Sequence, residues 1–137
     1  IEQKKEERLR AESPNSEEHW RWRMQMAERI AGSVGTVWPG VKGMYVLGSA
    51  KNATARAHSD IDLLIHFDGD EAERASLEKW LDGWSLALNE MNFLRTGFRC
   101  GRLLDVYFVS SDEISRREGM AAKIGAITDA ARPLKLG

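Results

Sequence analysis

Apolar residues recur with helical spacing in two segments of the chain. The first stripe, spaced by four, three and four residues, predicts a helix that ends at Gly32 and Gly35; its members are Trp20, Met24, Ala27 and Ala31. A longer stripe predicts a second helix over 71–92, through Leu77, Leu81, Trp84, Leu88 and Met91. Ser110 or Ser111, standing before two acidic residues, predicts the capped start of a further helix.

Continuous apolar runs separate these helices. Their strong β formers predict strands at 44–48, 60–67 and 103–109. The segment 38–43 contains a proline and two glycines, so it is predicted to be a loop. The alanine-rich segment after the first strand predicts a weak helix with Ser49 as its N-cap. Near the C-terminus, Pro133 predicts a short hairpin or an edge strand.

The length and composition favour one domain. The 137 residues are 42% hydrophobic and 30% charged, which is enough to build a core and to solvate a surface. Residues 1–14 are almost entirely polar and are expected to form a frayed helix or a disordered lead-in. The rest, 15–137, is predicted to be a single domain. Because the chain begins with Ile1, a fragment of a longer protein stays among the alternatives.

The charge balance argues against several classes of partner. The formal net charge is −1, from 20 basic and 21 acidic residues, so nonspecific binding to nucleic acid or to a membrane surface is not expected. A local basic groove stays compatible with this composition. No apolar run approaches the roughly 20 residues of a membrane span. Cys100 is the only cysteine, so no intrachain disulfide can form, and a cytoplasmic location is expected.

Carboxylates in apolar strands carry the main chemical signal. Asp60 and Asp62 are separated by one residue, so in a strand they point to the same face and repel each other. Asp105 stands between apolar neighbours on both sides, where aspartate is a poor strand former. If the two strands are neighbours, the carboxylates converge, and a divalent cation removes their repulsion. Their hard oxygen ligands suit Mg²⁺ or Mn²⁺.

Gly48 and Ser49 supply features that favour phosphate binding. Glycine allows a phosphate to approach the backbone closely, and the hydroxyl of Ser49 can donate a hydrogen bond. Taken singly, these residues have ordinary explanations: an Asp-x-Asp or Gly-Ser pair is common, and Arg56 fits a solvated helix residue. The order of the glycine, the paired acids and the later single acid is what favours phosphate transfer with metal ions.

In this order the residues resemble the DNA polymerase β-like nucleotidyltransferase superfamily, and "SDIDLLI" is similar to its small prokaryotic members, the minimal nucleotidyltransferases. The matching motifs are Gly48-Ser49, Asp60-Ile61-Asp62 and Leu104-Asp105-Val106. The resemblance implies an α/β fold of the α+β type, with a mixed β-sheet flanked by helices. It also implies Mg²⁺-dependent transfer of a nucleoside monophosphate from an NTP, with ATP expected, to a hydroxyl acceptor on a protein or small molecule.

The same resemblance assigns roles to residues. Asp60, Asp62 and Asp105 would be the catalytic metal ligands, Asp105 would also act as, or help, the general base, and Gly48 and Ser49 would bind the triphosphate.

The sequence also departs from the family pattern. Where small members carry an arginine and a glycine after the Gly-Ser pair, this chain has Asn52 and Ala53. Lys51 or Arg56 would then supply the positive charge for the nucleotide. The chain has little length left for a helical domain, so a partner protein or a second copy is expected to complete the acceptor site.

Two further hypotheses stay open from the sequence. One is a binding module with little or no activity, such as the antitoxin of a toxin–antitoxin pair, which would use the sheet edge or the helix carrying Trp80 and Trp84. The other is a regulatory or substrate-binding domain of a larger enzyme.

Overall fold

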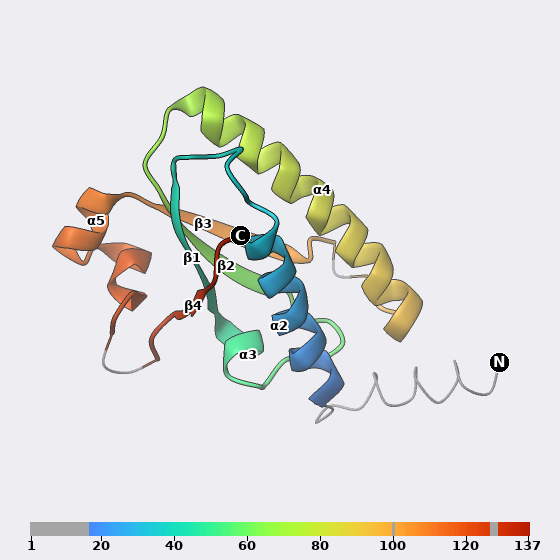
Figure 1. The fold of residues 1–137 in the computed structure, drawn as a ribbon. Helices are drawn as coiled ribbons and strands as arrows, with labels where there is room; N and C mark the ends of the chain where they lie inside the picture. The colour runs from blue at the N-terminus through green and yellow to red at the C-terminus, as the bar shows by residue number, and fades with distance from the viewer. Residues whose placement is uncertain (1–16, 100, 127–128) are drawn as a thin grey trace.

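The protein is built on a four-stranded mixed sheet with the strand order β3-β2-β1-β4. The computed structural model describes residues 17–99, 101–126 and 129–137. β1 is antiparallel to both β2 and β4, and β3 runs parallel to β2 (Figure 1). The strands are β1 (Val41–Leu47), β2 (Ile61–Phe67), β3 (Leu104–Val109) and β4 (Arg132–Leu134). This topology confirms the predicted mixed sheet flanked by helices.

Two long helices, α2 (Glu17–Gly32) and α4 (Glu71–Thr96), pack on one face of the sheet. Alternation along β2 directs Ile61, Leu63 and Ile65 to this face, where all three are 0% exposed. Asp70 begins α4, because its carboxylate accepts the N–H of Glu73 at 2.7 Å. The apolar stripes of both helices therefore meet the strands in the main core.

The opposite face of the sheet is covered only in part. Short helices α5 (Ser111–Arg116) and η1 (Gly119–Lys123) cover part of it, and η1 contacts β3. Their apolar contacts form a small second core, whose buried members are Leu47, Leu64, Val109, Ala121 and Ala131. Near the N-terminal ends of β2 and β3, the side chains of Asp62 and Asp105 are only half-buried.

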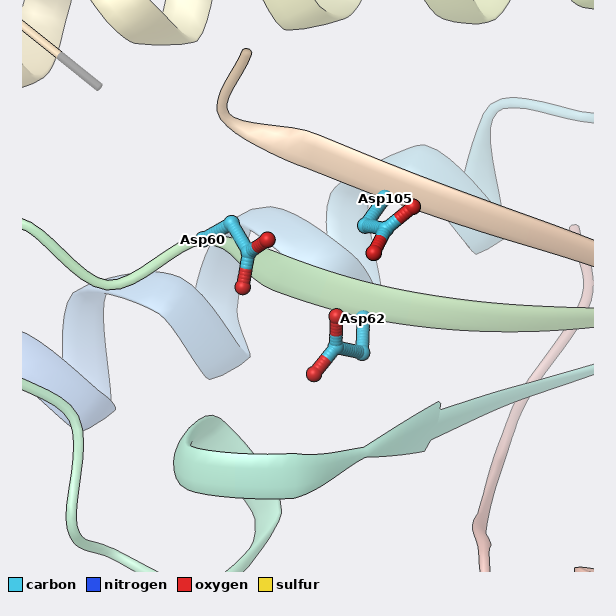
Figure 2. Close-up of side chains that lie close together, drawn as sticks. All are labelled: Asp60, Asp62 and Asp105. Atoms are coloured by element: carbon cyan, nitrogen blue, oxygen red, sulfur yellow. The ribbon is translucent and has the colours of Figure 1, made fainter. Parts of the chain in front are cut away.

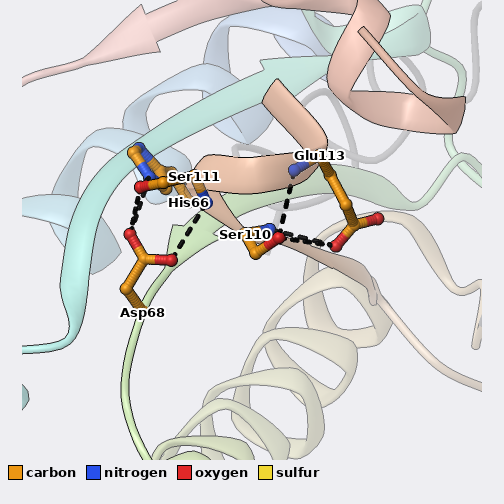
Figure 3. A network of polar contacts seen from close by, with 5 residues as sticks. All are labelled: His66, Asp68, Ser110, Ser111 and Glu113. Atoms are coloured by element: carbon orange, nitrogen blue, oxygen red, sulfur yellow. Dashed lines mark hydrogen bonds and ion pairs between the residues drawn. The ribbon is translucent and has the colours of Figure 1, made fainter. Parts of the chain in front are cut away.

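A polar network fixes α5 to the far end of β2 (Figure 3). The carboxylate of Asp68 accepts hydrogen bonds from the N–H of Ser111, at 2.9 Å, and from its hydroxyl. These bonds hold the pKa of Asp68 below its ordinary value, and His66 Nε2 lies 3.1 Å from the same carboxylate. Ser110 and Glu113 form a capping box. The capped helix start predicted at Ser110 or Ser111 is thus confirmed, with Ser110 as the cap.

The start of β1 and the end of α4 differ from the boundaries predicted from the sequence. The first strand begins at Val41, so the loop predicted over 38–43 is wrong in its second half. A bulge between Val41 and Gly43 interrupts the apolar alternation that would have revealed the strand. The helix predicted over 71–92 continues to Thr96 and ends at Gly97, whose φ of 84° is left-handed. Pro133 lies in the edge strand β4, as predicted.

Some predictions fall outside the described residues. The polar lead-in 1–14 and Cys100 belong to this group. Among the helices that the structure describes, none has both the length and the apolar character needed to cross a membrane.

Candidate active site and metal centre

Three aspartates gather at the N-terminal ends of β2 and β3 (Figure 2). Asp62 on β2 pairs in register with Asp105 on the parallel strand β3, and Asp60 directly precedes β2. One carboxylate oxygen from each residue lies within 4.8 Å of the other two. The convergence predicted from the sequence is therefore confirmed, although Asp60 lies just outside the strand that was predicted to include it.

The electrostatics of the cluster favour a bound cation. Burial raises the pKa of Asp62 to about 6, and the negative charges of Asp60 and Asp105 add to the shift. Burial and the charge of Asp105 also raise the pKa of Asp60, against a smaller opposite effect of Arg23. All the ligand atoms are carboxylate oxygens, which fit a hard divalent cation. Such a cluster is typical of two-metal catalysis.

Gly48 allows the chain to turn directly beside Asp62. Its φ of 68° is left-handed, and a Cβ at this position would overlap the Asp62 carboxylate. The chain then enters α3 (Gly48–Lys51), whose N-cap is Leu47, without a side-chain hydrogen bond. The prediction of Ser49 as N-cap is therefore wrong: Ser49 lies inside the first turn, because the strand runs into the helix without an intervening residue.

The two predicted basic residues occupy different surroundings. Lys51 is held in place: its Nζ donates to Asp129 Oδ1 at 2.6 Å and to the carbonyl of Ala130 at 3.0 Å. Arg56 has an exposed side chain, and its N–H donates to Ser59 Oγ at 2.9 Å in the loop that leads to Asp60. Lys51 thus lies next to the Gly48 turn within α3, whereas Arg56 lies in the following loop.

The buried guanidinium of Arg23 fixes the loop before Asp60, a role that the sequence analysis missed. Its Nε donates to the carbonyl of Ser59 at 2.8 Å, and its Nη2 donates to the carbonyl of Ala57 at 3.2 Å. Asn92 on α4 also donates to Ala57, at 2.8 Å. The side chain of Arg23 is 0% exposed. A signal was present, because Arg23 lies four residues before Ala27 on the face that packs on the sheet.

A second missed residue, Tyr107, orients the acid at 105. Its hydroxyl donates to Asp105 Oδ2 at 2.8 Å, and this bond is the main cause that raises the pKa of Tyr107 to about 12. The two side chains share a face because they are two residues apart on β3. The two-residue spacing of Asp105 and Tyr107 in a predicted strand was the signal that could have identified this contact.

We expect the metal-free protein to lose stability as the pH rises through the range of about 4 to about 6. The pKa of Asp62 is above its ordinary 3.8 in the folded state, so the folded state binds the proton more tightly than the unfolded state does. That stabilisation is complete at low pH and is lost above the folded pKa. Because solvent screens these half-exposed groups, the loss should be only about 1 kcal/mol.

Melting temperatures in a chelator, at about pH 5 and about pH 7.5, measure this loss. Asp62→Asn should show a smaller fall in stability than the wild type does. Asp82→Asn, an exposed change on α4, is the matched control and should behave as the wild type. If the melting temperature fell equally in the wild type and in Asp62→Asn, protonation of Asp62 would not be the cause of the pH dependence.

Comparison with known proteins agrees with this geometry. Residues 3–100 match the family described as "Poly(A) RNA polymerase, mitochondrial-like, central palm domain". Searches of curated proteins and of solved structures gave no match.

The segment that matches the family includes Gly48, Ser49, Asp60 and Asp62 and ends before Asp105, so the place of Asp105 in the site rests on the structure. The match covers most of the chain, and the mixed sheet is consistent with a palm. The protein therefore belongs to the family of mitochondrial-like poly(A) RNA polymerase central palm domains, which are polymerase β-like nucleotidyltransferase palms.

Proposed function

We propose that the protein transfers a nucleoside monophosphate from an NTP, with ATP as the expected donor, to a hydroxyl group on a protein or a small molecule. The observation that carries this proposal is the convergence of Asp60, Asp62 and Asp105 within 4.8 Å in a palm fold. Structural carboxylates in a core are normally paired with cations or hydrogen-bond donors. Here burial and mutual repulsion instead raise the pKa of Asp60 and of Asp62.

In the reaction, the acceptor oxygen bonds to the α-phosphorus, the bond to the β-phosphate oxygen breaks, and pyrophosphate leaves. Asp105 takes the proton of the acceptor hydroxyl, in an orientation fixed by Tyr107. Mg²⁺ or Mn²⁺ held by Asp60, Asp62 and Asp105 would offset the negative charge that develops on the phosphates. Gly48 lets the triphosphate approach the backbone beside this cluster.

The remaining polar groups near the turn would bind the nucleotide. The Ser49 hydroxyl and the Lys51 ammonium group are the candidates on α3. Arg56, exposed on the following loop, is the further basic candidate. The left-handed backbone of Ala53, at φ 58°, stands where small prokaryotic members carry glycine, which supports a turn of the same shape.

An RNA 3′ end is the second candidate acceptor. The family description names a poly(A) RNA polymerase, which favours adenylate addition to RNA. The net charge of −1 favours a protein or small-molecule acceptor instead, since it provides no general attraction for a polyanion.

A partner protein or a second copy would complete the acceptor site. Leu86 and Leu94 on α4 are 69% and 73% exposed, which supports a contact surface there. In a toxin–antitoxin pair, as for small prokaryotic members, this surface would bind the toxin.

Label transfer from α-labelled NTPs tests the proposal. The protein is incubated with Mg²⁺, each of the four NTPs, and one of three acceptors: the protein itself, a pool of hydroxyl-bearing small molecules, or an RNA oligonucleotide. We expect labelled product from ATP in one acceptor set and none with Asp62→Asn. The absence of product in every set, together with an unchanged melting temperature on adding Mg²⁺ and ATP, would contradict the proposal.

A further inference from the structure

Two lysines from distant parts of the chain bind one carboxylate. Lys51, at the end of α3, and Lys123, at the end of η1, both contact Asp129. The Nζ of Lys51 lies 2.6 Å from Asp129 Oδ1, and the Nζ of Lys123 lies 3.0 Å from Oδ2. Asn52 also donates to Asp129 Oδ1, at 3.3 Å. Each oxygen of this carboxylate therefore accepts from a different ammonium group.

Two members of this ion-pair cluster, Lys123 and Asp129, line a cavity beside the acidic site. The cavity has a volume of about 200 Å³, and its lining includes Gly48, Asp62, Tyr107, Lys123 and Asp129. Asp62 is a candidate metal ligand, and Gly48 is the turn that lets a phosphate approach. Lys123 and Asp129 thus line the space into which a triphosphate held at Asp62 would extend, and Lys51 contacts Asp129 at its edge.

Two ammonium groups share the single negative charge of Asp129, so they could bind a more highly charged phosphate in its place. Asp60, Asp62 and Asp105 already repel one another, and Asp129 adds another carboxylate close by. Two ammonium groups are the complement that a triphosphate needs beside such a cluster. The side chain of Asp129 is 57% exposed, and its φ of 49° is left-handed for a residue with a Cβ. Because Asp129 and Lys123 are 57% and 41% exposed, solvent screens their ion pair and leaves it open to exchange.

We propose that Asp129 is an internal substitute for a substrate phosphate: it holds Lys51 and Lys123 beside Asp62 in the free protein, and the outer phosphates of the NTP displace it from both lysines. The inference rests on the proposed function and adds Lys123 and Asp129 to its site. Asp129 positions the lysines before binding and competes with the nucleotide for them. The contact therefore weakens the binding of the triphosphate, whereas a nucleotide that lacks the outer phosphates leaves Asp129 in place.

Calorimetric titration with Mg²⁺ and α,β-methylene-ATP, which is not hydrolysed, tests this exchange. Asp129→Asn should lower the Kd about fivefold, because both lysines lose their negatively charged partner. Asparagine tolerates the left-handed backbone, so the fold should be kept. Lys123→Met should raise the Kd about tenfold. The exposed α4 changes Lys79→Met and Asp82→Asn are matched controls and should leave the Kd unchanged.

The double variant separates direct exchange from a general charge effect. In the Lys123→Met background, Asp129→Asn should lower the Kd by less than it does in the wild type, because only Lys51 is left to be released. A gain as large as in the wild type would overturn the inference, as would an unchanged Kd in Lys123→Met or in Asp129→Asn. If Asp62→Asn weakens binding while changes at 123 and 129 do nothing, only this inference fails. If the wild type does not bind the analogue, the proposed function fails and this inference with it.

Discussion

The substitution Asp62→Asn should lower the rate of nucleotidyl transfer by about 10³-fold or more. The loss of one metal ligand removes several kcal/mol of transition-state stabilisation. The free protein should keep its stability or gain some. Asparagine has nearly the shape of aspartate and removes one of the charges that Asp60 and Asp105 repel. Label transfer measures the activity, and the melting temperature without divalent ions measures the stability.

The two readouts distinguish a catalytic carboxylate from a structural one. Asp60→Asn and Asp105→Asn should give the same combination of lost transfer and retained stability. Destabilisation of all three variants by more than about 1 kcal/mol would indicate that the carboxylates hold the fold instead. Label transfer that persists in Asp62→Asn would refute the role of that residue directly. Asp82→Asn, exposed on α4, should leave both quantities unchanged.

The substitution Arg23→Met should destabilise the protein by about 3–5 kcal/mol, because several buried hydrogen-bond acceptors lose their donor. Arg23 donates to the carbonyls of His19 and Ala57, at 3.2 Å each, and to that of Ser59 at 2.8 Å. Methionine fills much of the volume but supplies no donor. Urea denaturation measures the loss.

A milder variant keeps this prediction testable if Arg23→Met does not fold. Arg23→Lys retains a charge but lacks the planar fork, so it should cost less than Arg23→Met and still weaken the binding of Mg²⁺ with nucleotide. Weaker binding is expected because the loop that ends at Asp60 loses its anchor. Arg29→Met, on the exposed side of the same helix, should lie within about 0.5 kcal/mol of the wild type. Equal stabilities of Arg23→Met and Arg29→Met would contradict the anchoring role.

The sequence predicted the elements that carry a regular apolar pattern. The stripe through Leu77, Leu81 and Leu88 marked α4 because a surface helix must bury one face. The apolar run 60–67 marked β2. Boundaries were less accurate where glycine interrupts the pattern, as at the start of β1, because the bulge at Gly43 breaks the period of two.

The acidic cluster was predictable because aspartate among apolar strand residues needs a compensating partner. What could not be predicted was the set of long-range polar contacts. Arg23 reaches the loop before Asp60, and Lys51 and Lys123 share Asp129 across the chain. Such contacts join residues with no fixed spacing, so they depend on the finished fold rather than on local periodicity.

Binding of Mn²⁺ to the protein alone, followed as loss of the free-ion electron paramagnetic resonance signal, tests the account most directly. Asp105 is the decisive position, because it comes from a different strand and lies outside the segment that matches the family. We expect saturable binding by the wild type and at least about a tenfold loss of affinity in Asp105→Asn, as in Asp60→Asn and Asp62→Asn. Undiminished Mn²⁺ binding by Asp105→Asn would contradict the claim that these carboxylates hold one metal centre.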